Sequence, residues 1–338
     1  MRNADCPIDF VITWVDGSDP NWLEEKRRCL PDSVAEEFDG GDARFRQWDT
    51  LKYLFRGIEE CCPWVNRVHF VTWGHLPEWL NVENERLSIV RHEDFIPERY
   101  LPTFKSSTIE FNFHRIENLA EHFVNFNDDM LILKDASPDD FFHNGLPRET
   151  AIEVPSRISK GVKYFSDINN VGIINAHFNK RQAVKQNIAC WYSLKYGKRL
   201  LHTLAMLGYP QFTGFYNNHL PYSFLKKSFE EAWEVEGDTL DQVCARKLRH
   251  VLDVNQNLMV DWQLATGQFA SRSPKVGRAF HLCEMADVLA AADYIRGRKG
   301  LFACVNDTNA LGDDYLRANE TIVEALEEIF PTKSSFER

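Results

Sequence analysis

The chain has 338 residues but lacks any apolar run close to the ~18 residues that a membrane-spanning helix needs. Its N-terminus, Met-Arg-Asn-Ala-Asp, leads straight into a strand pattern without the apolar core of a signal peptide. We therefore expect a cytoplasmic protein, whose membrane association is at most peripheral and at the inner face of the membrane.

Several motifs that define large enzyme classes are also missing. The sequence contains no GxGxxG, P-loop, GxSxG or HExxH pattern. These absences argue against dinucleotide oxidoreductases, P-loop kinases, serine hydrolases and zincin proteases.

Cysteine is present but follows no pattern of a disulfide framework or a zinc site. The eight cysteines form no CxxC pair and have no histidines at zinc-ligand spacing, and two of them are the adjacent Cys61 and Cys62. Scattered thiols of this kind indicate reduced core residues in a cytosolic protein.

The charge of the chain is acidic overall but uneven. The formal net charge is -11, yet residues 157–250 hold 14 Lys and Arg against 7 Asp and Glu. An acidic surface repels phosphate backbones, so we expect no nucleic-acid partner. The basic middle segment fits an anionic ligand, and solvated helix faces are the alternative explanation.

Apolar strand patterns alternate with helical patterns over the first 155 residues, which predicts an α/β fold with a Rossmann-like, mostly parallel sheet flanked by helices. The strand patterns cover residues 7–15, 67–73, 86–90 and 123–133. The helical patterns cover residues 48–58 and 108–119.

The rest of the chain changes character. Residues 179–265 have a mainly helical pattern with interleaved aromatic and basic residues, and we interpret them as a helical insertion. Residues 278–330 then contain two strand patterns, which we expect to return to the core sheet, and a closing helix over 314–330. We therefore predict a single domain over residues 1–338.

Acidic residues follow three of the predicted strands. Asp128 and Asp129 interrupt an apolar run, Asp16 follows the first strand, and Asp307 follows the strand at 301–305. Adjacent carboxylates repel each other unless a cation is near, and such oxygen ligands suit Mg²⁺ or Mn²⁺. The acidic pair alone is more often part of a turn, and Asp16 is equally explained as a turn residue, but parallel strand ends converge at one sheet edge.

Basic and imidazole groups that suit phosphate chemistry occur in three places. His114 and Arg115 precede the strand that leads to the acidic pair, His219 lies in an Asn-Asn-His-Leu-Pro loop, and Arg249 ends a short basic run. A lone histidine is more often structural, and a short basic run is more often a helix surface.

These segments together resemble the Stealth family, which includes capsular polysaccharide phosphotransferases and the animal GlcNAc-1-phosphotransferase. The first block is residues 8–20, and the second runs from Arg44-Phe45-Arg46 through residues 102–107 and 114–116 to 126–129. Residues 217–221 and 249–256 resemble a third block, and residues 305–308 a fourth. Within the second block, Lys105 stands where the family pattern has Asn.

The resemblance implies a GT-A-like fold and a sugar-phosphate transferase. A hydroxyl of an oligo- or polysaccharide acceptor, itself carrying phosphodiesters, would attack the β-phosphorus of a UDP-sugar and release UMP. Residues 1–155 would bind nucleotide sugar and metal, and residues 179–265 would contact the acceptor and its phosphates. Any membrane association would be peripheral and would be with the capsule assembly machinery.

The resemblance also implies roles for individual residues, and two base candidates stay open. Metal ligands would be Asp128, Asp129 and Asp307, holding Mg²⁺ or Mn²⁺. Arg249 and Arg115 would stabilise phosphoryl charge, and His219 or His114 would take the acceptor proton. Asp16, Gly17 and Ser106 would contact the nucleotide part of the donor.

Two other functions fit the same sequence. A metal-dependent glycosyltransferase with the same acidic crevice would release UDP instead of UMP. A non-catalytic glycan-binding or capsule-assembly protein would need aromatic residues but has little use for acidic strand ends.

Overall fold

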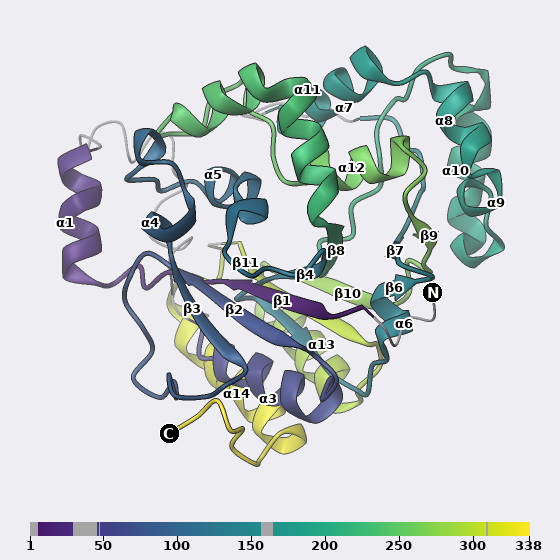
Figure 1. Ribbon diagram of the computed structural model, residues 1–338. Helices are drawn as coiled ribbons and strands as arrows, with labels where there is room; N and C mark the ends of the chain where they lie inside the picture. The colour runs from purple at the N-terminus through teal and green to yellow at the C-terminus, as the bar shows by residue number, and fades with distance from the viewer. Residues whose placement is uncertain (1–5, 30–45, 47, 157–164, 309) are drawn as a thin grey trace.

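A five-stranded sheet forms the centre of the molecule (Figure 1). The computed structural model describes residues 6–29, 46, 48–156, 165–308 and 310–338. The strand order is β3-β2-β1-β4-β8, and the first four strands are parallel while β8 is antiparallel to β4. The strands are β1 (Ile8–Thr13), β2 (Arg67–Thr72), β3 (Leu87–Arg91), β4 (His122–Asn127) and β8 (Tyr222–Leu225). The predicted α/β class and mostly parallel sheet are confirmed.

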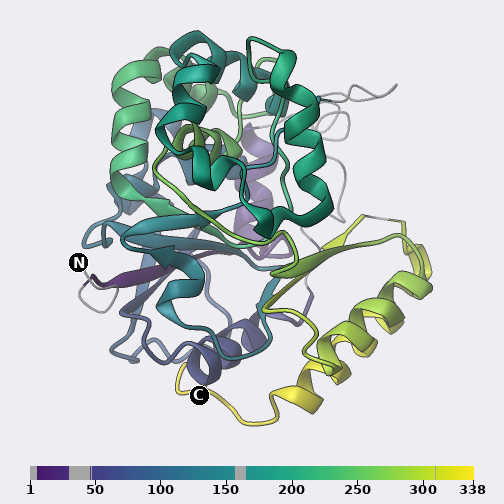
Figure 2. The ribbon, with the colours of Figure 1, turned by 90° about the vertical axis from the view of Figure 1, so that its right-hand side faces the viewer.

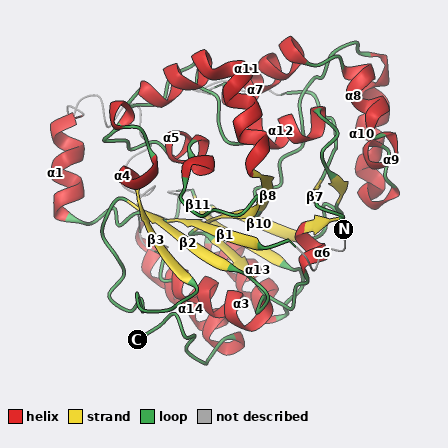
Figure 3. Cartoon of the chain, in the orientation of Figure 1, coloured by secondary structure: helices red, strands yellow, loops and turns green. Residues whose placement is uncertain are grey.

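Helices cover both faces of this sheet, so the protein has three layers (Figure 3). The alternation along β1 shows why both faces are apolar: Phe10 and Ile12 pack into one core and Val11 into the other. On the first face lie α3 (Leu51–Cys61), α13 (Met285–Arg296) and α14 (Tyr315–Ile329). On the second face lie α5 (Ser106–Phe111), α7 (Ser166–His177), α11 (Lys226–Ala245) and α12 (Asn257–Ala265).

A second sheet has the order β10-β11-β5, with β10 parallel to β11 and β5 antiparallel to it. It contains β5 (Met130–Ile132), β10 (Gly277–Leu282) and β11 (Phe302–Asp307). The expected return of the late strands to the core sheet is therefore wrong in detail. The apolar run at 123–133 breaks at the acidic pair, and only its second half, β5, pairs with the late strands.

Close packing fixes β5 against the first face of the core. A Cβ on Gly57 of α3 would lie 2.7 Å from the backbone oxygen of Ile132, so only glycine allows this approach. The helix predicted over 108–119 is shorter than expected, because α5 ends at Phe111 and a single 3₁₀ turn, η4 (Phe113–Arg115), follows.

A third small sheet and a group of short helices complete the fold (Figure 2). The sheet has the order β6-β7-β9, with β6 (Phe142–His143), β7 (Leu146–Glu149) and β9 (Ala270–Ser271). The short helices near it are α6 (Pro138–Phe141), α8 (Lys180–Gln186), α9 (Ile188–Trp191), η5 (Leu194–Arg199), α10 (Leu200–Ala205) and η6 (Met206–Gly208). The remaining helices are α1 (Pro20–Cys29), α4 (His92–Phe95), η3 (Glu98–Tyr100) and η7 (Gly312–Asp314). Among the residues described, no helix is both long and apolar enough to cross a bilayer.

Candidate active site

Many polar residues line a cavity of about 530 Å³ at the carboxyl end of the central sheet. β2 and β3 follow one another on one side of β1, whereas β4, the next strand of this sheet along the chain, lies on the other side of β1. Such a reversal leaves a crevice beyond the carboxyl ends of the two strands, where Thr13 is paired with Asn127. The cavity occupies this crevice.

One wall of the cavity carries carboxylates. Asp128 and Asp129 form the turn between β4 and β5, and Asp307 is the last residue of β11. The antiparallel pairing of β5 with β11 continues past the strand, because Val305 N–H donates to the Asp129 carbonyl at 2.8 Å. Backbone hydrogen bonds therefore bring Asp307 to the same cavity as the acidic pair, as the sequence predicted.

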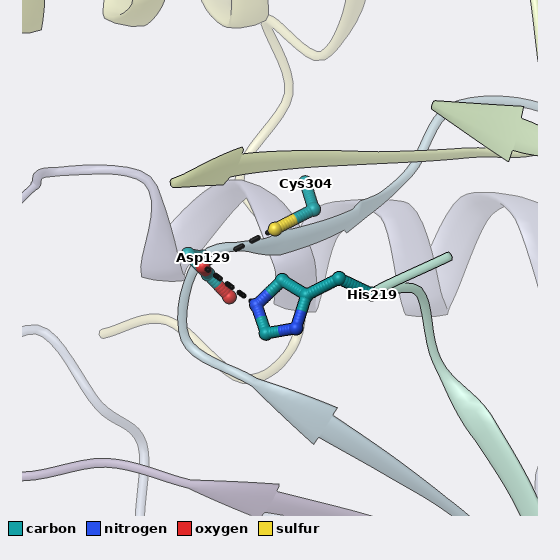
Figure 4. A group of neighbouring side chains, drawn as sticks. All are labelled: Asp129, His219 and Cys304. Atoms are coloured by element: carbon teal, nitrogen blue, oxygen red, sulfur yellow. Dashed lines mark hydrogen bonds and ion pairs between the residues drawn. The ribbon is translucent and has the colours of Figure 1, made fainter. Parts of the chain in front are cut away.

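Asp129 lies beside two other potential ligands (Figure 4). The Cys304 thiol is 3.2 Å from Asp129 Oδ2, and His219 Nε2 is 3.8 Å from the same oxygen. Asp129 Oδ1 is buried and has no hydrogen-bond partner among the described residues. A buried carboxylate oxygen without a donor is costly, and a divalent cation would satisfy it. The residues present therefore fit a metal ion.

Asp128 lines the same cavity, and its carboxyl group is a weaker acid than an ordinary aspartate. The protein that encloses the site, together with the neighbouring Asp129 carboxylate, raises the pKa of Asp128 to about 7. The Asp128 side chain is nevertheless exposed to the open cavity, so water reduces the contribution of burial. The repulsion from Asp129 remains, and a bound cation would relieve it.

The opposite wall carries His219, which a strained loop presents to the cavity. His219 has a φ of 47°, in the left-handed region that side chains other than glycine seldom adopt. Asn217 Oδ1 holds this conformation by accepting from His219 N–H at 2.8 Å and from the Tyr222 hydroxyl at 2.5 Å. The nearby Asp129 carboxylate raises the pKa of His219, which makes the imidazole a stronger proton acceptor.

Arg249 reaches the same wall from a turn that a buried ion pair holds in place. Lys105 Nζ lies 2.7 Å from Asp253 Oδ2, and both side chains are almost fully buried. The Asp253 carboxylate also accepts from Arg246 at 2.7 Å and from the His250 N–H at 2.9 Å. The residue at which the chain departs from the family pattern thus fixes the turn next to Arg249.

The structure adds residues to the site that the sequence did not single out. Trp48 Nε1–H donates to Asp307 Oδ2 at 3.2 Å, and Arg46 lies 3.8 Å from the same oxygen. Both line the cavity, as do Trp22 and Phe104, whose rings meet edge to face at 5.6 Å. Arg46 belongs to the second resemblance block, which is the one signal that could have identified it; Arg44 and Phe45 lie outside the described residues.

Other residues singled out from the sequence lie elsewhere. Ser106 lines the cavity, but Asp16 and Gly17 stand just outside it, and Asp16 Oδ1 accepts from the Ser18 hydroxyl at 2.6 Å, as in a turn. His114 and Arg115 do not line the cavity. His114 packs against Phe229 and Trp233, and burial lowers its pKa to about 4.

Fold and site together define an α/β protein with an acidic, metal-compatible cavity at the reversal point of its sheet, faced by an arginine and a histidine. The chain belongs to the Stealth family. Residues 7–34 match the family model "Stealth protein CR1, conserved region 1", and residues 44–149 match "Stealth protein CR2, conserved region 2".

Full-length relatives support this membership. The chain is 35% identical to the capsular polysaccharide phosphotransferase WcwK of Streptococcus pneumoniae, with both chains covered completely. It is 38% identical to the receptor polysaccharide phosphotransferase WefC of Streptococcus gordonii, over 98% of each chain. Among solved structures, the galactosyltransferase LgtC in complex with donor and acceptor sugar analogues matches with a TM-score of 0.40 and 10% identity, over 97% of this chain and 98% of that one.

Proposed function

We propose that this protein transfers a sugar phosphate from a nucleotide sugar to a saccharide hydroxyl, and so builds phosphodiester linkages into a surface polysaccharide. The observation that carries this proposal is the meeting of Asp128, Asp129, His219 and Arg249 around one cavity in a chain whose full-length relatives are polysaccharide phosphotransferases. We further infer that the donor is a UDP-sugar and that the reaction takes place at the cytoplasmic side of the membrane.

In the proposed reaction, the oxygen of the acceptor hydroxyl forms a bond to the β-phosphorus of the donor. The bond from that phosphorus to the bridging oxygen breaks, and UMP leaves with the electron pair. Positioning and charge stabilisation account for most of the rate in such transfers.

The carboxylate wall would hold the donor's diphosphate. Asp128, with Asp129 or Asp307, would bind Mg²⁺ or Mn²⁺, which supplies positive charge to the phosphate oxygens when bound. Trp48 and Arg46 would keep the Asp307 carboxylate in place through their contacts with its Oδ2 atom.

The opposite wall would act on the acceptor and on the phosphoryl group that is being transferred. His219 would take the proton from the acceptor hydroxyl, since it lines the cavity and His114 does not. Arg249 would stabilise the charge on the transferring phosphoryl oxygens. Ser106, Trp22 and Phe104 would contact the nucleotide near the end of β1, and Asp16 and Gly17 would shape the turn beside them.

Nucleotide release tests the proposal. Purified protein is incubated with Mg²⁺, a panel of UDP-sugars and a phosphodiester-containing oligosaccharide, and the nucleotides are separated by anion exchange. Acceptor-dependent UMP is the expected product. Acceptor-dependent UDP would instead establish a glycosyltransferase, and binding of the oligosaccharide without any nucleotide release would establish a glycan-binding protein.

A further inference from the structure

One long segment of this acidic protein contains no acidic residue. Between residues 168 and 229 the sequence has eight Lys and Arg and no Asp or Glu, although the whole chain has 50 Asp and Glu. The short helices α8, α9, η5, α10 and η6 all lie within it. No carboxylate among the described residues forms an ion pair with Arg181, Lys185 or Lys198.

The same helices expose large apolar side chains. Three of the leucines are exposed by more than half: Leu194 (88%), Leu201 (66%) and Leu207 (56%). Ile188 and Tyr209 are exposed to a similar degree. The three-residue spacing from Leu201 through Leu204 to Leu207 keeps these leucines on one side of α10 and η6. Single exposed leucines are ordinary, but six exposed large apolar residues within 22 residues of the chain are a concentration that favours an interaction surface.

Buried contacts hold this surface rigidly on the domain. Trp191 and Tyr196 are buried, and the Tyr196 hydroxyl donates to the Cys190 carbonyl at 2.6 Å. Lys180 Nζ is ion-paired with Glu153 at 2.8 Å and also donates to the Met206 carbonyl at 2.7 Å. The exposed leucines therefore project from a well-anchored scaffold, and their exposure does not reflect loose packing.

We propose that this surface docks on an anionic phospholipid bilayer. We call it the leucine–lysine surface, and it comprises Ile188, Leu194, Leu201, Leu204, Leu207 and Tyr209 with the basic residues Arg181, Lys185, Lys195, Lys198 and Arg199. Apolar side chains enter the boundary between headgroups and acyl chains, while Lys and Arg stay at the level of the lipid phosphates. A membrane surface is the partner that offers both environments side by side.

Two other partners would satisfy either the apolar residues or the basic residues of this surface, but not both. A second copy of the chain would cover the leucines, but a two-fold symmetric interface would place the basic residues of one surface against those of the other, and residues 168–229 contain no carboxylate to pair them. A phosphodiester-containing polysaccharide would match the basic residues but offers nothing apolar to the leucines.

The position of the surface leaves the cavity accessible. Figures 1 and 2 show α8, α9 and α10 together at the end of the molecule opposite α1. The cavity lies toward α1, because the carboxyl end of β1 and Trp22 of α1 both line it. Docking through the leucine–lysine surface therefore holds the protein at the membrane without closing the site.

Vesicle flotation tests this proposal without any nucleotide sugar. The protein is floated with phosphatidylcholine vesicles that contain either no phosphatidylglycerol or about one third of it, at low and at high salt. We expect binding to the anionic vesicles only, weakened by salt. The triple variant Leu194→Ser/Leu201→Ser/Leu207→Ser should lower the partition coefficient at least about tenfold. Arg181→Gln/Lys185→Gln/Lys198→Gln should lower it by at least about tenfold as well.

Two leucines on the other side of the molecule provide the matched control. Leu289 and Leu316 are 57% and 69% exposed on α13 and α14, so Leu289→Ser/Leu316→Ser removes two exposed leucines without touching the surface. This variant should float as the wild type does. Equal flotation of all variants, or no flotation of the wild type, would overturn the proposal. So would a wild-type dimer that the leucine variant converts to a monomer, because a second copy would then occupy the surface. Each of these outcomes leaves the nucleotide-release result unaffected.

Discussion

The two walls of the cavity are built in different ways. Backbone hydrogen bonds position the carboxylates, since Asp128 and Asp129 form a turn between two strands and Asp307 ends a third. Side-chain contacts position the residues of the opposite wall. His219 depends on a left-handed backbone conformation held by Asn217, and Arg249 depends on a turn that the Asp253 carboxylate holds through Lys105 and Arg246.

Substitutions in the two walls should therefore affect turnover and stability to different degrees. A carboxylate at a strand end can be replaced by an uncharged side chain while the strand pairing persists. A loss of turnover in such a variant therefore reflects the lost carboxylate and not a changed fold. Side-chain hydrogen bonds and ion pairs hold the other wall, so some of its variants alter geometry and stability as well.

The largest loss of turnover should come from the carboxylate wall. Asp128→Asn keeps the shape of the side chain but removes the charge that would bind the metal, and turnover should fall by more than about 10³-fold. Thermal unfolding should show an intact fold. Asp135→Asn changes an exposed carboxylate outside the cavity and serves as the control. Near-normal transfer by the Asp128 variant would remove the metal-binding role.

A similar but smaller effect is expected for the arginine of the opposite wall. Arg249→Ala should lower kcat/KM by about 10³-fold, because the charge on the transferring phosphoryl group would lose its guanidinium partner. Arg115→Ala is the comparison variant, since Arg115 is exposed and donates to Asn112 away from the cavity. Steady-state kinetics should show nearly unchanged turnover for the Arg115 variant. If the two variants were equally impaired, Arg249 would have no special role.

The two candidate bases can be compared in the same way. His219→Gln should lower kcat by about 10²-fold, the lower end of the contribution of a general base. His114→Gln should retain most of the activity, because His114 packs against Phe229 outside the cavity. A larger loss in the His114 variant, with the fold intact by circular dichroism, would reverse the assignment.

The smallest effect on turnover, with a clear effect on stability, is expected for the buried ion pair. Lys105→Met should destabilise the protein by about 3 kcal/mol, since it removes one partner of a buried charge pair. Asp253 keeps its contact with Arg246, so Arg249 should stay near its place and turnover below the unfolding temperature should fall only a few-fold.

Urea unfolding measures this difference directly. Lys227→Met is the control, because Lys227 forms an exposed i,i+4 pair with Glu231 that contributes little. Equal stability of the Lys105 and Lys227 variants would show that the buried pair does not support the turn.

The sequence predicted the carboxylate wall better than its opposite. Acidic residues directly after apolar strands are a local pattern that the sequence shows by itself. The expected reason for their convergence was wrong for Asp307, which reaches the cavity from β11 of the second sheet and not from an edge shared with β4. The pattern also misplaced some residues. His114 and Arg115 precede β4 in the sequence, yet α5 ends before them and they lie on the 3₁₀ turn η4, outside the lining of the cavity.

The α/β class, the order of strands and helices along the core, the acidic strand ends and the membership of the Stealth family all follow from the amino-acid sequence alone. Each of these depends on neighbours along the chain or on a conserved block of residues. Three further features became known from the folded chain. β5 pairs with β11 outside the central sheet, Lys105 contacts Asp253, which lies 148 positions further along the chain, and the leucines of α10 are exposed. These features depend on contacts between distant segments, and periodicity in a single chain does not encode which segments meet.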